Sequence, residues 1–121
     1  MTDISDEYMH QRLATARPFS LVILRHGPNY GGPDAEHLIW EHGRRNMQLQ
    51  ADGLMSIVCP VDDGSDLGGV AIFGTDESTT RSILAADPAV TADVFRFTVH
   101  PCFSFPGDSL RLASALDEID Y

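Results

Sequence analysis

Stretches rich in β-forming residues, each bounded by glycine, proline or aspartate, predict four strands. They span residues 19–26, 54–61, 67–74 and 95–100. The turn-forming residues at 62–66 indicate that the second and third strands form a hairpin. Apolar and polar side chains alternate along the last strand, and we expect Pro101 to end that regular pattern.

A helix is predicted between the first two strands. It begins after Asp34, which can cap it, and it continues to about Ala51, where Asp52 and Gly53 end it. Four residues at spacings of four, three and four define one face of this helix: Leu38, His42, Arg45 and Leu49. Two of these four residues are polar, although the pattern places them toward the interior of the protein.

A second helix is predicted over residues 77–86, with Thr75 or Asp76 as its cap. Asp87 and the proline after it end this helix, and a short turn over residues 89–92 leads to the last strand. The order of elements is therefore strand, helix, strand, strand, helix, strand. This order predicts an α+β fold, the ferredoxin-like βαββαβ arrangement with an antiparallel sheet and both helices on one face.

The chain is expected to comprise one folded domain with an extension at each end. Residues 1–18 are interpreted as a short N-terminal helix or a mobile arm, and residues 19–105 as the α+β domain. Residues 106–121 form a C-terminal tail, in which a helix over residues 109–119 could pack outside the main fold.

Both faces of the predicted sheet are apolar. In the first strand, Leu21 and Ile23 point one way while Val22 and Leu24 point the other, and the next two strands repeat this pattern. Helices cover only one face, so the other face needs a second cover. The simplest cover is the same sheet of another copy of the chain, and we therefore predict a homodimer.

Composition restricts the partners and the location. The chain has 121 residues and a formal net charge of −10, and all eight of its basic residues are arginine. A surface this acidic repels phosphate groups, so nucleic acid and anionic membranes are not expected as partners. The longest apolar runs are too short to span a bilayer, and the acidic first residues differ from a secretory signal, so we expect a cytoplasmic protein. Cys59 and Cys102 are accordingly expected to be reduced, half-buried thiols.

The ordered set of motifs resembles the YCII-related family of dimeric α+β barrels. The resemblance covers roughly residues 19–103 and rests on six features: Leu24-Arg25-His26-Gly27-Pro28-Asn29, His42, Cys59-Pro60, Asp66-Leu67-Gly68-Gly69, Ala86-Asp87-Pro88-Ala89-Val90 and Val99-His100-Pro101. The family implies a dimeric barrel and a histidine–aspartate pair in a pocket near the sheet. One relative removes chloride from a chlorinated hydroxyquinol. Cys59 stands where the family usually has glycine, which is expected to add a side chain close to the pocket.

His42 and Asp87 are the candidate catalytic residues. A neutral imidazole can take a proton from a ligand and return it, and a carboxylate bound to the ring fixes its tautomer. Such a pair requires the imidazole nitrogen and the carboxylate to lie within about 2.6–3.2 Å of each other, or to be bridged by one water. The alternatives are a core histidine bonded to backbone groups and an aspartate that only initiates the turn before Pro88.

Arg45 and Cys59 are the candidate substrate-binding residues. Arg45 could bind an anionic substrate through its fork of donors, or its charged end could simply reach solvent. Metal sites are not expected, because Asp62, Asp63 and Asp66 lack a closing glutamate and His37 with Glu41 lacks a third ligand. The glycine-rich segments match neither a P-loop nor a dinucleotide-binding fingerprint, so we expect no nucleotide cofactor.

The sequence therefore favours an isomerase- or lyase-like enzyme without metal or nucleotide cofactor. It would use His42 and Asp87 for acid–base chemistry on a small polar or aromatic substrate, and the resemblance to the YCII-related family adds dehalogenation as one such reaction. A non-catalytic ligand-binding or sensing module could use the same pocket, and a purely structural dimerisation domain would fill it with side chains. The fold alone does not distinguish these functions.

Overall fold

The structure is a computed structural model that describes residues 1–113 of the chain. Its elements, in chain order, are α1 (Asp6–Leu13), β1 (Arg17–His26), α2 (Ala35–Ala51), β2 (Met55–Pro60), β3 (Leu67–Phe73), α3 (Glu77–Ala85), α4 (Pro88–Thr91) and β4 (Phe95–Ser104). The strands and the two helices predicted for the α+β domain are all present, with boundaries that differ by one or two residues except at the last strand. The N-terminal segment contains the helix α1.

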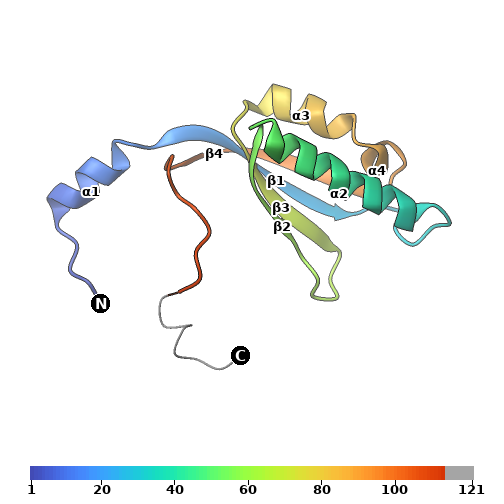
Figure 1. The fold of residues 1–121 in the computed structure, drawn as a ribbon, viewed down its shortest axis with the longest axis horizontal. Helices are drawn as coiled ribbons and strands as arrows, with labels where there is room; N and C mark the ends of the chain where they lie inside the picture. The colour runs from blue at the N-terminus through green and yellow to red at the C-terminus, as the bar shows by residue number, and fades with distance from the viewer. Residues whose placement is uncertain (114–121) are drawn as a thin grey trace. The chain divides into compact units, whose positions relative to one another are not determined.

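The sheet has four strands in the order β2-β3-β1-β4, which is the ferredoxin-like order (Figure 1). β3 pairs antiparallel with β1, where Val22 lies opposite Ala71, and with β2, where Val58 lies opposite the same Ala71. The predicted α+β class and antiparallel sheet are confirmed. β2 and β3 form the predicted hairpin.

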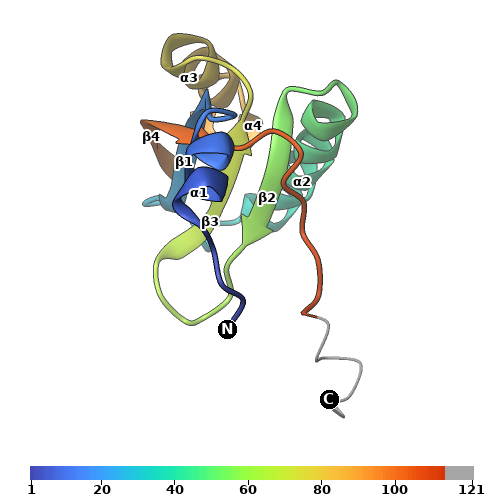
Figure 2. The ribbon, with the colours of Figure 1, turned by 90° about the vertical axis from the view of Figure 1, so that its left-hand side faces the viewer.

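The core lies between the helices and one face of the sheet. Val22 of β1 and Phe73 of β3 are buried in one cluster with Leu49 of α2 and Leu84 of α3. Figure 2 shows α2 and α3 close to end-on, next to the strands that they cover. Since successive side chains of a strand point to opposite faces, the neighbours of these strand residues lie on the face without helices.

The helix-free face is apolar along its centre. Leu21 and Ile23 of β1 and Val70 and Ile72 of β3 are only partly buried, in contrast to the residues that alternate with them. Ile23 lies opposite Val70, and Leu21 lies opposite Ile72, so the four side chains form one patch.

Three local expectations were wrong. β4 does not stop at Pro101 but continues to Ser104. It is an edge strand, where a proline can face away from the ladder because its missing N–H is not needed there. The segment expected as a simple turn contains the one-turn helix α4, and Asp34 precedes α2 without a hydrogen bond from its side chain to the helix.

The chain divides into two compact units, one formed by Pro18–Ser104 and the other by Met1–Arg17 with Phe105–Tyr121. In the second unit, Arg12 of α1 makes an ion pair with Asp108, and its guanidinium lies 4.5 Å from the centre of the Phe105 ring. The helix expected over residues 109–119 falls largely outside the described residues, and residues 109–113 are not helical. None of the helices in residues 1–113 is long and apolar enough to cross a membrane.

Candidate active site

A cavity of about 280 Å³ lies between α2 and the sheet. Its walls come mainly from aliphatic and aromatic residues of the strands, including Val22, Leu24, Val58 and Phe95. α2 contributes the polar residues His42 and Asn46 to the lining. A largely apolar cavity with a few polar groups is the usual form of a site for a small organic ligand.

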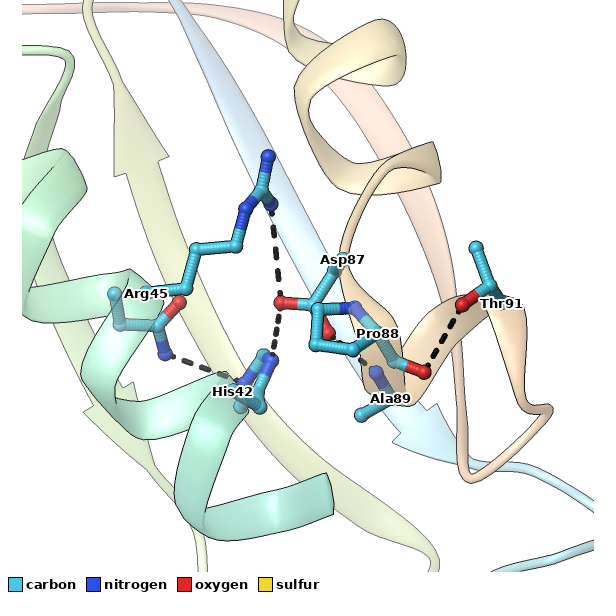
Figure 3. Close-up of polar contacts among 7 residues, drawn as sticks. His42, Arg45, Asp87, Pro88, Ala89 and Thr91 are labelled. Carbon is cyan, nitrogen blue, oxygen red and sulfur yellow. Dashed lines mark hydrogen bonds and ion pairs between the residues drawn. The ribbon is translucent and has the colours of Figure 1, made fainter.

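His42 is held at this cavity by α2 and by a buried carboxylate. Its Nδ1 lies 2.8 Å from Oδ2 of Asp87, and the side chain of His42 is 12% exposed (Figure 3). The predicted contact between the two residues is therefore confirmed. Because an ionised carboxylate only accepts hydrogen bonds, Nδ1 carries the proton, and the lone pair of the neutral ring is on Nε2.

Asp87 is fixed in place by its own position in the chain. It is the N-cap of α4, and its Oδ1 accepts a hydrogen bond of 2.8 Å from the backbone N–H of Ala89. Pro88 occupies the first position of α4, where its missing N–H has no consequence. The alternative that Asp87 initiates a turn is thus also correct, since one carboxylate oxygen caps α4 and the other binds His42 (Figure 3).

The ionised form of Asp87 is stabilised despite its burial. Burial favours the neutral acid and by itself would raise the pKa of Asp87, whose side chain is only 1% exposed. The hydrogen bond and charge of His42, the N–H of Ala89 and the charge of Arg45 outweigh this effect and bring the pKa below its ordinary value. Asp87 is therefore a carboxylate at neutral pH.

Arg45 faces Asp87, from one turn further along α2 than His42. Its Nη1 lies 3.8 Å from Oδ2 of Asp87, too far for a hydrogen bond (Figure 3). This Nη1 is buried and has no hydrogen-bond partner within residues 1–113. Arg45 is not among the residues that line the cavity, and its side chain is 24% exposed. Its role in binding an anionic substrate stays a prediction.

Asn46 is a site residue that the sequence analysis missed. Its Nδ2 lies 3.2 Å from Nε2 of His42, and the amide N–H donates to the lone pair of the ring. Asn46 follows His42 by four residues, which places both on the same face of α2. That spacing was the available signal, but it could not indicate that the contact lies at a cavity.

Cys59 lines the cavity, as does Val70, its partner on β3. Its role in binding a substrate stays a prediction. Cys59 and Cys102 are both free and half-buried, as predicted.

Metal ligands are not gathered at the site. Among residues 1–113, the histidines, cysteines and carboxylates form no group of three that could hold a metal ion.

Comparison with known proteins does not assign a family. No family model matches the chain, and no curated protein matches it either. Among solved structures, the chain is similar to 5-chloro-2-hydroxyhydroquinone dehydrochlorinase (TftG) from Burkholderia phenoliruptrix AC1100, in complex with 2,5-dihydroxybenzoquinone. The similarity has a TM-score of 0.48 and 16% sequence identity, and it covers 68% of this chain and 90% of that chain. Membership of the YCII-related family stays a prediction.

Proposed function

We propose that this protein is an enzyme in which His42 acts as a general base toward a small, largely apolar ligand bound in the cavity. The observation that carries this proposal is the contact of 2.8 Å between Nδ1 of His42 and Asp87. It leaves Nε2 as the basic nitrogen of a residue that lines the cavity.

The chemistry is proton transfer at Nε2 of His42. A ligand C–H or O–H proton moves to Nε2, and the buried carboxylate of Asp87 stabilises the imidazolium that forms. His42 then returns the proton to another atom of the ligand, which gives an isomerisation, or the ligand expels a leaving group, which gives an elimination. Loss of a halide ion is one such elimination.

A neutral, planar probe can test this function before the natural substrate is identified. In 5-nitrobenzisoxazole, removal of the proton at C3 forms the nitrile and breaks the N–O bond, which releases a coloured cyanophenolate. We expect the wild-type protein to accelerate this release by about 10²–10⁴-fold over buffer. His42→Gln should abolish the acceleration, and Asp87→Asn should lower it while leaving the protein folded.

His37→Gln is the matched control, because His37 is an exposed histidine of the same helix. This variant should retain the wild-type rate. Equal rates for wild-type protein and His42→Gln would contradict the proposal.

A second candidate function is a ligand-binding or sensing module without catalysis. Asn46 favours it, because its amide already donates to the lone pair that a general base would use. The two functions differ in one outcome. A pure binding module would bind the planar probe in competition with product, and it would release no cyanophenolate above the rate of His42→Gln.

We further propose that the chain acts as a homodimer. The support is the patch of Leu21, Ile23, Val70 and Ile72 on the helix-free face, since the helices of the same domain pack on the opposite face. Two such faces packed together would form a closed barrel from two sheets. His42 belongs to α2 and Asp87 caps α4, so the pair lies on the helix side, away from this contact.

A further inference from the structure

The cavity is lined by a second histidine, His26, at the end of β1. Its ring is stacked on the ring of Tyr30, with centroids 3.5 Å apart and an angle of 6° between the planes. The Phe95 ring lies 6.2 Å from the ring of His26 and 5.0 Å from the ring of His42. The two imidazoles therefore approach one phenyl ring in the wall of one cavity.

The backbone holds His26 firmly. Its N–H donates to the carbonyl of Asp66 at 2.8 Å, and the N–H of Gly27 donates to the carbonyl of Val94 at the same distance. A Cβ at position 27 would lie 2.3 Å from the carbonyl oxygen of Asp93, so only glycine allows this close approach. His26 is thus fixed by the backbone on one side and by Tyr30 on the other.

The ring nitrogens of His26 are available to a ligand. Within residues 1–113, neither of them makes a hydrogen bond, in contrast to both nitrogens of His42. The face of a phenol ring also attracts a cation, so the stack on Tyr30 suits an imidazolium as well as a neutral imidazole.

Proton removal by His42 requires a hydrogen-bond donor elsewhere in the cavity. When a ligand loses a proton to Nε2, negative charge develops on another ligand atom, and an apolar cavity offers little to stabilise it. Asn46 already donates to His42 in the free protein. We propose that His26 is a second catalytic residue, whose ring N–H donates to the ligand atom that becomes negative as His42 takes the proton.

This inference rests on the proposed function and identifies the ligand class as a planar molecule with an acidic proton at one end and an incipient oxyanion at the other. With 5-nitrobenzisoxazole, the C3 proton goes to His42 and its electron pair forms the nitrile. The N–O bond breaks, and the oxygen that keeps the electron pair accepts a hydrogen bond or the proton from His26.

His26→Phe tests the inference, because phenylalanine keeps a ring against Tyr30 and removes both nitrogens. We expect kcat/KM for 5-nitrobenzisoxazole to fall by about ten-fold or more. His26→Gln, which keeps an N–H donor, should recover part of this loss. The matched control is His100→Phe, since His100 is exposed on β4 and outside the cavity.

A binding measurement separates this inference from the general-base proposal. His26→Phe should weaken binding of 4-nitrophenolate relative to the uncharged 4-nitrotoluene, whereas His42→Gln should change that ratio less. In the folded wild-type protein, 4-nitrophenolate should also shift the ¹⁵N resonances of the His26 ring. An unchanged affinity ratio in His26→Phe, or unshifted His26 resonances, would overturn the role of His26. Failure of the general-base proposal would instead appear as equal rates for wild type and His42→Gln.

Discussion

Nδ1 of His42 lies 2.8 Å from Oδ2 of Asp87, although 45 residues separate them in the chain. α2 carries the histidine, and the cap of α4 carries the aspartate. The same carboxylate thus caps the N-terminus of α4 and orients the candidate base. This double use of Asp87 gives predictions that separate its charge from its capping role.

Asp87→Asn is expected to reduce the dependence of stability on pH in acid. The pKa of Asp87 is lowered in the folded protein, so its ionised form stabilises the fold fully above the unfolded pKa, about 3.9, and this stabilisation is lost as the pH falls through the folded pKa. Asparagine can still cap α4 but carries no charge. Urea unfolding between pH 3 and pH 7 measures this dependence. The free energy of unfolding of Asp87→Asn should be lower than that of the wild type by about 1–3 kcal/mol at pH 7, and it should fall less steeply as the pH decreases.

Asp34→Asn removes the same charge from an exposed aspartate that makes no capping hydrogen bond, and it is the control for the Asp87 variant. The free energy of unfolding of Asp34→Asn should fall with decreasing pH as steeply as that of the wild type. If the free energy of unfolding of Asp87→Asn also falls as steeply as that of the wild type, Asp87 is not held as a carboxylate by its neighbours.

Arg45→Met should raise the pKa of Asp87. The guanidinium of Arg45 lies 3.8 Å from the buried carboxylate and favours its ionised form. We expect a loss of about 1 kcal/mol in the free energy of unfolding, because His42 and Ala89 still bind Asp87. Carboxyl ¹³C NMR of Asp87 measures the pKa directly. Arg44→Met is the control, since Arg44 is an exposed neighbour paired with Glu41, and it should leave the pKa of Asp87 unchanged.

The chain should sediment as a dimer at micromolar concentration. Ile23→Arg places a charge within the apolar patch of the helix-free face and should convert the dimer to a folded monomer. Gln48→Arg adds the same charge to an exposed position of α2 and should leave the dimer intact. A wild-type chain that sediments as a monomer would contradict the dimer, and the patch would then need another cover.

Replacement of both cysteines by serine should change the free energy of unfolding by less than about 1 kcal/mol. Cys59 and Cys102 are free and half-buried, so neither forms a disulfide whose loss would matter. Thermal unfolding should also be the same with and without reductant for the wild-type protein. A midpoint that depends on reductant would show that an oxidised form contributes to stability.

The sequence by itself determined the order of the elements and the class of the fold. Alternation along β1 and the spacing of Leu38, His42, Arg45 and Leu49 on α2 are local periodicities, and each reflects which side of an element meets the core. His42 was identified as a candidate for the same reason, since it is a polar residue on an inward face. Pro101 was misjudged, because whether a proline is tolerated depends on which strand becomes the edge of the sheet.

Only the tertiary structure decided what surrounds His42. The pairing register of β2 with β3 places Cys59 opposite Val70, and both residues line the cavity. The path of the chain after α3 brings Asp87 to Nδ1, Arg45 turns toward that carboxylate, and the end of β1 places His26 in the cavity wall. These contacts join segments far apart in the chain, and no local pattern encodes them, because they depend on how the elements pack against one another.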